Sequence, residues 1–316
     1  MTHVAAAPKQ QGMALVIVLW VLSLMTIMAG SFALSTQRET AVLHHAHERA
    51  RALALAEGAI YYAMLMLNLP DQTLRWQGDG RPYVWDAKGT KVRIRIQDEG
   101  GKLDINVAQE ASLKTAFKLM GLSEDQASAI TDNILDWRDA DDVKRPNGAE
   151  APEYEARRMN APPQNRQFLV MDEVQSVLGI SPELFKKMQT WFTLYSGIDG
   201  LDPSKVSEEI LLALSAGDSA VVQSVLRQRM DNLPVTLPPV PGITFTQAAG
   251  VSYNIKAEII IDGDQHFGIS ADIRRGATNG NLPFTILRWR PFHSTSKSNT
   301  EFASPTHRNS PPDLNS

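Results

Sequence analysis

The sequence predicts an α+β fold, in which a long N-terminal helix packs on an antiparallel sheet and a large all-α insertion interrupts that sheet. Three observations lead to this prediction. A charge-free apolar run at 13–34 continues into a helix-forming segment that has no proline before Pro70. Short segments typical of strands lie on both sides of a central block, 101–232, and that block has helical periodicity instead.

The apolar run determines how the chain meets a membrane. Its roughly 20 residues, at about 1.5 Å each, are long enough to span the hydrocarbon core of a bilayer. A cleaved secretory signal would need a more basic start than the single Lys9. Two other interpretations fit: an uncleaved signal anchor, or a short leader at 1–12 that is cut between Gly12 and Met13. In both, residues 13–34 are the membrane span.

Helix-forming residues continue from Ser35 to Leu69, with apolar positions at helical spacing. We therefore expect one helix over about 13–69, on the order of 85 Å long. Strands are expected next at 73–77, 82–86 and 90–97, and the last of these alternates apolar residues with arginines. Residues 35–100 thus form the predicted helix and first strands.

The central block has turn signals that divide it into helices. The segments 119–123 and 177–181 each carry Gly where one helix would end and Ser where the next would begin. They resemble the turns of helix-hairpin-helix or SAM-like domains. The pairs Ser181-Pro182 and Asp202-Pro203 are each expected to open a helix.

Strands are predicted again at 252–262, 266–274 and 283–290, after a proline-rich stretch at 233–242. Residues 233–292 are therefore expected to complete the sheet that the central block interrupts. The following segment, 293–316, is rich in Ser, Asn, Thr and Pro, and we expect it to be disordered.

Composition excludes several kinds of chemistry. The chain has 316 residues, no cysteine and a net charge of −4. The absence of cysteine excludes disulfides, thiolate metal sites and a cysteine nucleophile. Because phosphate contacts dominate nucleic-acid affinity, the acidic balance argues against a nucleic-acid partner, despite the hairpin-like turns.

The segment 132–155 carries the densest set of carboxylates. Hard oxygen ligands at this density suit Ca²⁺, which takes about six to eight oxygens in flexible geometry, better than Mg²⁺. The spacing from Asp139 to Glu150 matches a twelve-residue calcium loop, but Lys144 stands where an EF-hand needs Gly, so an EF-hand is excluded. A solvated loop whose aspartates cap helices, and a catalytic carboxylate pair, remain as alternatives.

Several motifs carry a resemblance to a known family. The first is Gly-Lys-Leu-Asp-Ile-Asn at 101–106. The second is Asp-Trp-Arg-Asp at 136–139, followed by Gly-Ala-Glu at 148–150 and then Tyr154. The segments 168–179 and 203–214 add a following helix and a leucine-rich end. Together with a leader ending at Gly12, these motifs resemble the minor pseudopilin K family of the bacterial type II secretion system (general secretion pathway protein K), over about residues 10–292.

The resemblance implies a pilin-like fold and a role at the tip of the type II secretion pseudopilus. There the protein would initiate pseudopilus assembly and support protein export across the outer membrane. The implied partners are minor pseudopilins I and J of the same system and the prepilin peptidase, which would cut after Gly12 and leave Met13 to be methylated. The implied location is the bacterial inner membrane, crossed once, with the C-terminal bulk in the periplasm. No enzymatic activity is implied.

The resemblance also implies a structural calcium ion, because family members bind calcium in the helical domain near the acidic motif. Its ligands are expected among five carboxylates, without an individual assignment. They are Asp136, Asp139, Asp141, Glu150 and Glu153.

Ile17, the fifth residue after the expected cut, departs from the pilin pattern, which has Glu there. A carboxylate in lipid is costly unless it is paired, and in pilins a neighbouring subunit's amine supplies the partner. A subunit without this Glu cannot make that pair with the subunit above it, so we expect this chain to cap the fibre. The bulky helical insertion favours the same position, because a repeating fibre has no room for it in every subunit.

Two alternatives stay open. One is a K-like minor pilin of a type IV pilus system. The other is a membrane-anchored hydrolase that uses the acidic loop, which would need a general acid with a raised pKa and a binding cleft. The sequence shows neither of these features.

Overall fold

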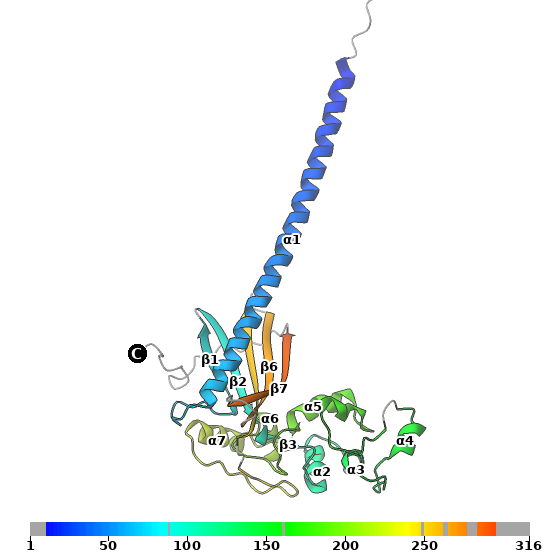
Figure 1. Cartoon of the computed structure of the whole chain (residues 1–316), viewed down its shortest axis with the longest axis vertical. Coiled ribbons are helices and arrows are strands. Elements are labelled where there is room, and N and C mark those ends of the chain that lie inside the picture. Colours follow the sequence, from blue (N-terminus) through cyan, green and yellow to red (C-terminus); the bar gives the residue numbers. More distant parts are fainter. Residues whose placement is uncertain are drawn as a thin grey trace, which may run out of the picture. The chain divides into compact units, whose positions relative to one another are not determined.

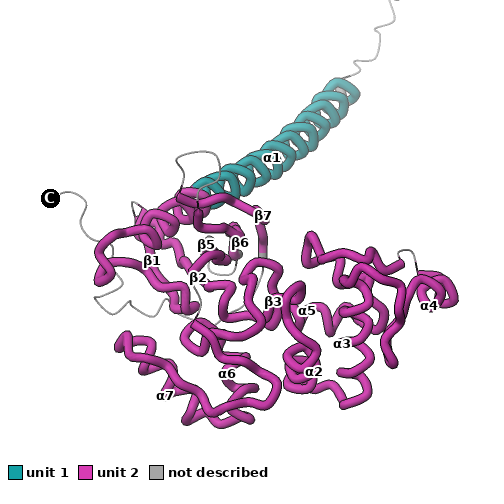
Figure 2. Tube along the Cα trace, turned by 60° about the horizontal axis from the view of Figure 1, so that its bottom comes forward, with its two compact units in different colours: residues 1–54 teal, residues 55–316 magenta. Residues whose placement is uncertain are grey.

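The structure is a computed structural model that describes residues 11–87, 89–159, 162–247, 250–261, 265–276 and 283–294. It is α+β, as the sequence predicted. The chain divides into two compact units, residues 1–54 and 55–316 (Figure 2). Residues 1–10 of the expected leader and 295–316 of the expected tail lie outside the described residues.

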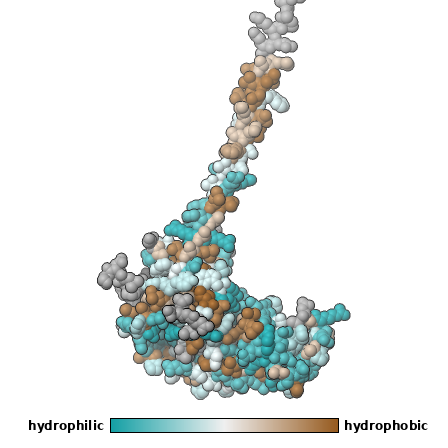
Figure 3. Space-filling model, viewed as in Figure 1, coloured by the Kyte–Doolittle hydropathy of each residue, from teal (hydrophilic) through white to brown (hydrophobic). Residues whose placement is uncertain are grey.

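Helix α1 runs from Gln11 to Leu67 and contains the apolar run. Proline, which would break it, is absent until Pro70, and the hydroxyls of Ser23 and Thr26 donate to carbonyls four residues earlier. Its side chains over 13–34 are exposed and mostly apolar (Figure 3). Among the described residues α1 is the one helix that is long and apolar enough to cross a membrane, which agrees with the predicted single-pass anchor.

Five antiparallel strands form the main sheet, in the order β1-β2-β5-β6-β7 (Figure 1). They are β1 (Asp79–Ala87), β2 (Thr90–Asp98), β5 (Ser252–Ile261), β6 (Gln265–Arg275) and β7 (Phe284–Ser294). Strands β2 and β5 pair directly, although the whole helical part of the chain separates them in sequence. The helical part therefore interrupts the sheet, as predicted. His293 and Ser294, expected to begin the tail, belong to β7.

The last turns of α1, within the larger unit, cover one face of this sheet. Tyr62 of the helix stacks on Trp85 of β1, with ring centroids 5.6 Å apart. Buried apolar residues alternate along β2 and recur at helical spacing in α1: Val92, Ile94 and Ile96 in the strand, and Ala56, Ile60 and Ala63 in the helix. The strict alternation read from the sequence thus places the apolar set against α1, and burial of this surface holds helix and sheet together.

The strand predicted at 73–77 is wrong. This segment is an irregular turn, because Asp71 accepts hydrogen bonds from both the N–H and the hydroxyl of Thr73. The ring of Trp76 then stacks on Tyr83 of β1 with centroids 4.2 Å apart, so its apolar surface is buried without strand pairing.

Between β2 and β5 the chain is mostly helical. The described helices are α2 (Glu110–Leu119), α3 (Glu124–Arg138), α4 (Ala151–Ala156), α5 (Pro182–Trp191), α6 (Glu208–Leu214) and α7 (Ser219–Met230), with the 3₁₀ turns η1 (Glu99–Gly101) and η2 (Met171–Ser176). One apolar core extends from Leu103 near the start of this part to Ile243, which lies beyond α7 and beyond the predicted boundary at 232. A short parallel pair, β3 (Leu103–Asp104) with β4 (Phe192–Thr193), was not predicted.

The two predicted helical hairpins differ from each other. In the first, Gly121 has a φ of 95° after α2, and Ser123 caps α3 through a capping box with Gln126. In the second, Gly179 and Ser181 precede α5 as expected, but the first arm is the 3₁₀ turn η2 rather than an α-helix.

The helix predicted to open at Asp202-Pro203 is also wrong. Asp202 Oδ1 accepts the N–H and the hydroxyl of Ser204 and closes a local turn. Helix α6 begins only at Glu208, where the side chain of Ser207 caps it.

Asp98 links the end of β2 to η1, at the point where the chain leaves the sheet. Its Oδ1 accepts the N–H of Gly100 at 2.9 Å. Burial raises the pKa of Asp98 to about 6, although the Gly100 N–H and the nearby Lys205 ammonium act to lower it. A buried carboxyl at this junction therefore stays partly protonated near pH 6.

Asp98→Asn is expected to flatten the pH dependence of stability. The folded chain titrates Asp98 at about pH 6 and an unfolded chain at about pH 4, so the folded state binds the proton more tightly. Asp98 thus lowers the free energy of unfolding as pH rises through this window, by about 2–3 kcal/mol in total. Asparagine keeps the acceptor for Gly100 and cannot ionise. The measurement is urea unfolding of the full chain in detergent at several pH values between 4 and 7. If the free energy of unfolding falls with pH equally in the wild-type protein and in Asp98→Asn, the prediction is wrong.

Candidate metal centre

Helix α3 carries the predicted acidic motif into the core. Its residues from Ile130 to Trp137 are all buried. The ring of Trp137 lies parallel to that of Phe168, with centroids 5.9 Å apart, and also contacts Tyr154. The Tyr154 hydroxyl accepts the N–H of Leu178 at 3.0 Å. The aromatic residues of the motif therefore fix the end of α3 to its surroundings and hold the neighbouring Asp136 fully buried.

The loop after α3 folds back over Asp136. The N–H of Arg145 donates to Asp136 Oδ2 at 3.2 Å, and the Nε of Arg145 lies 3.3 Å from Oδ1. The same guanidinium reaches Asp139 Oδ2 at 3.2 Å. A Cβ on Gly148 would overlap Asp136 Oδ2, so the loop can approach this carboxylate closely only with glycine at that position.

Two carboxylate oxygens of this loop, Asp139 Oδ1 and Glu150 Oε1, are buried without a hydrogen-bond partner in the described part of the chain. Burial, together with the surrounding aspartates, raises the pKa of Glu150 to about 7. Burial also raises the pKa of Asp136 to about 6, against the opposing effect of Arg145. The loop is therefore short of positive charge.

Four of the five predicted ligands lie near one another, because the charges of Asp136, Asp139 and Asp141 each act to raise the pKa of Glu150. Asp141 and Glu153 also have partners of their own. Asp141 is exposed and accepts the N–H of Val143. Glu153 forms an ion pair with Lys144 at 2.8 Å and accepts the N–H of Glu150.

Among the described residues, no group of three or more His, Asp or Glu side chains is close enough to hold a metal ion as placed. The donor set still fits a hard cation, because it supplies desolvated carboxylates and two unpartnered oxygens. Arg145, which contacts both Asp136 and Asp139, supplies the positive charge instead.

Sequence reasoning missed two residues of this loop. One is Arg145. The other is Asn147, whose backbone and side-chain N–H groups both donate to Asp132 Oδ2 at 3.0 Å. The available signal was a Lys-Arg pair at 144–145 in the middle of an acidic stretch, where a basic residue has carboxylates on both sides.

The predicted processing and assembly residues lie in the smaller unit. Gly12 and Met13 are in the first turn of α1, and Met13 and Ile17 are 63% and 58% exposed. Cleavage after Gly12, methylation of Met13 and the assembly role of Ile17 stay predictions.

Comparison with known proteins shows that the chain is similar to protein K of the type II secretion system. A family model for protein K of the type II secretion system matches residues 94–197, which include the acidic loop. The type II secretion system protein K of Pectobacterium carotovorum subsp. carotovorum is 28% identical over 204 residues, covering 57% of this chain and 61% of the relative. That of Aeromonas hydrophila is 23% identical over 321 residues, covering 86% and 95%.

A solved structure shares the fold. A chain of the crystal structure described as the GspK-GspI-GspJ complex from the type 2 secretion system of enterotoxigenic Escherichia coli aligns with a TM-score of 0.53 and 16% identity. The alignment covers 78% of this chain and 98% of that one.

This chain and the solved structure thus share one fold, in which a long N-terminal helix packs on an antiparallel sheet and a helical part is inserted into that sheet. The chain resembles protein K of the type II secretion system, so the resemblance predicted from its motifs is confirmed. The matched names denote a component of a secretion system, and none of them denotes an enzyme.

Gly148→Ala is expected to lower the free energy of unfolding by about 1–3 kcal/mol, because its Cβ overlaps the Asp136 carboxylate. A double-mutant cycle, measured by urea unfolding of the full chain in detergent, tests the cause. In an Asp136→Ala background the penalty should shrink to about 0.5 kcal/mol or less, since the overlapping group is gone. An equal penalty in both backgrounds would mean that Gly148 is needed for another reason.

Proposed function

We propose that this chain is a minor pseudopilin that caps the pseudopilus of a type II secretion system. Residues 13–34 anchor it in the inner membrane, and the larger unit lies in the periplasm. There it initiates pseudopilus assembly and supports protein export across the outer membrane. The prepilin peptidase removes residues 1–12, and Met13 is then methylated.

The observation that carries this proposal is the helical part inserted between β2 and β5. A subunit inside a repeating fibre has neighbours on all sides, whereas a terminal subunit has space on one side for additional mass. The Ile at position 17 supports the same place, because it offers no carboxylate for pairing with a subunit above. The complex named for the matched structure supports minor pseudopilins I and J as the partners.

A K-like minor pilin of a type IV pilus system would share the fold, but the matched family and the curated relatives are named for type II secretion. The chain spans only 61% of the Pectobacterium relative, so partners and substrates remain part of the proposal. The raised pKa of Glu150 meets one of the two requirements for a membrane-anchored hydrolase, but the matched family and relatives are named for a secretion component and not for an enzyme.

Calcium has a structural role in this proposal. Asp136, Asp139 and Glu150 would hold the ion, and Asp141 and Glu153 remain candidate ligands. A divalent cation would neutralise carboxylates that now repel one another in a desolvated loop. It would therefore stabilise the loop between α3 and α4.

Calcium is expected to raise the melting temperature of the full chain in detergent, relative to the same protein in chelator. At a hundredfold excess over the dissociation constant the gain is about 2.7 kcal/mol. The calcium-dependent gain should disappear in Asp139→Ala and Glu150→Ala. Glu155→Ala is the matched control, because it removes the same charge from an exposed position of α4. No calcium response, or equal responses in Glu150→Ala and Glu155→Ala, would contradict the assignment.

Ile17→Glu is expected to place some of the protein along the shaft, because the new carboxylate can pair with the amine of a neighbouring subunit, although the bulky helical part keeps such subunits sparse. Immunogold labelling of fibres made by overproducing the major pseudopilin measures the position. Ile17→Leu is the control and should leave labelling at the ends. If Ile17→Glu also labels only the ends, position 17 does not decide which subunit caps the fibre.

A further inference from the structure

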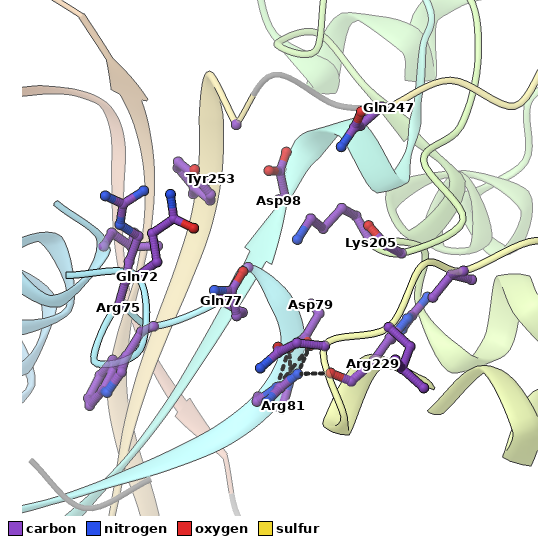
Figure 4. A pocket seen from close by; sticks show the side chains of 18 of the residues that line it. Gln72, Arg75, Gln77, Asp79, Arg81, Asp98, Lys205, Arg229, Gln247 and Tyr253 are labelled. Carbon is purple, nitrogen blue, oxygen red and sulfur yellow. Dashed lines mark hydrogen bonds and ion pairs between the residues drawn. The ribbon is translucent and has the colours of Figure 1, made fainter. Parts of the chain in front are cut away.

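A cavity of about 950 Å³ lies within the larger unit, where the sheet meets the helical part (Figure 4). Its walls come from the turn before β1, the ends of β1, β2 and β5, and two segments of the helical part, near 204–205 and 229–235. It shares no lining residue with the acidic loop. It is thus a separate feature from the candidate metal centre.

Positive charge exceeds negative charge in this cavity. Two carboxylates, Asp79 and Asp98, line it, whereas the cationic lining residues number five. These are Arg75, Arg81, Lys205, Arg229 and Arg275. An ion pair with a lining carboxylate forms only between Arg81 and Asp79, at 2.6 Å, in the described part of the chain.

Among the described residues, the other guanidinium groups donate hydrogen bonds only to carbonyl oxygens. Arg75 donates to the carbonyl of Leu69, and Arg275 to that of Leu67, each at 2.7 Å. Arg229, which is 7% exposed, donates through one terminal nitrogen to two carbonyls, while its buried Nε has no partner among the described residues. A carbonyl satisfies a donor but does not neutralise its charge, so these groups leave a positive potential in the cavity.

Lys205 extends its ammonium into the cavity (Figure 4). Within the described ranges this ammonium forms no hydrogen bond and no ion pair, although Asp98 is close enough to be influenced by its charge. The backbone of Lys205 is fixed, because Gly101 packs directly against its carbonyl and Gln97 donates to the same oxygen. The side chain therefore starts from a fixed point beside the cavity, and its ammonium has no acceptor among the described residues.

The cavity continues into an adjoining groove of about 610 Å³. The two share Ser204, Asn232, Leu233, Val235 and Gln247. The groove adds apolar surface from Pro234, Leu237 and Phe245, and one carboxylate, Asp202, which accepts hydrogen bonds from Ser204. The combined space is much larger than a single inorganic anion requires, and its partly apolar lining suits a peptide.

We propose that this cavity binds a carboxylate side chain of an acidic peptide segment from a partner protein, with the Lys205 ammonium as its direct contact. Arg229, Arg75 and Arg275 supply the surrounding positive potential, and the groove takes apolar residues next to the acidic one. Asp98 competes with the ligand for Lys205. The proposal does not depend on where in a fibre the chain is located.

Binding is tested with the full chain in detergent and a fluorescent, end-capped peptide that contains Leu-Asp-Glu-Leu. The matched peptide has Asn and Gln in place of the two acidic residues. Fluorescence anisotropy should show binding of the acidic peptide that is at least about tenfold tighter than that of the amide peptide. Equal binding of the two peptides would overturn the proposal.

The protein variants test the contact itself. Lys205→Gln should weaken acidic-peptide binding by about tenfold, whereas Lys186→Gln, which removes the same charge from an exposed position of α5, should change it by less than about twofold. Asp98→Asn should tighten binding several-fold, a gain that a misfolded variant cannot produce. Equal effects of Lys205→Gln and Lys186→Gln would overturn the assignment of Lys205.

Competition distinguishes a peptide from a small anion. Free glutamate and inorganic phosphate should displace the acidic peptide only at concentrations far above its own dissociation constant. If either of them binds as tightly as the peptide, the occupant is a small anion and the peptide proposal is wrong.

Discussion

The pairing of β2 with β5 is the constraint on which the other features of the larger unit depend. Its register runs from Val92 opposite Ile259 to Asp98 opposite Tyr253. This pairing fixes both ends of the helical part at one end of the sheet. Closing so long a connection costs little more than closing a shorter one, because the entropy of loop closure grows only with the logarithm of length. Burial of the alternating apolar residues of β2 against α1 stabilises this pairing, and that stabilisation offsets the entropy lost in closing the long connection.

The two polar sites of the larger unit are electrostatic opposites. In the acidic loop one arginine faces several carboxylates, and burial raises the pKa of Asp136 and Glu150. In the cavity beside Lys205, four of the five cations have no carboxylate ion pair within the described residues. Charge that is left unbalanced in a desolvated place costs stability, and such places concentrate where a ligand completes the balance. The overall net charge of −4 therefore does not indicate the local excess of negative charge in the acidic loop or of positive charge in the cavity.

The features that the sequence predicted correctly depend on local rules. Strict alternation fixed β2, the absence of proline fixed α1, and the pattern of Gly121 and Ser123 fixed the turn into α3. The errors occurred where a side chain competed for the backbone: Asp71 and Asp202 each closed a short turn where a strand or helix was expected. The β3–β4 pair was missed because its two strands are far apart in sequence and only two residues long.

For the sites, too, the sequence predicted what is local along the chain and missed contacts between distant segments. The residue types of the acidic loop were visible in the sequence, because they are neighbours along the chain. Which carboxylates turn inward, and the contacts of Arg145 with two of them, depend on how the loop folds back over α3. The cavity could not be predicted at all, since Arg75, Lys205 and Arg275 meet only after the sheet and the helical part have assembled.

The position of the cavity gives its proposed ligand an effect beyond its own binding. The chain leaves the sheet at Asp98 and returns to it at Ser252, and these two crossings lie side by side because Asp98 pairs with Tyr253. Lys205 comes from the helical part, whereas Arg75 precedes β1 and Arg275 ends β6. A carboxylate held among them would contact both parts at the place where they join. It would thereby stabilise one arrangement of the helical part against the sheet, since a ligand favours whichever arrangement it binds more tightly.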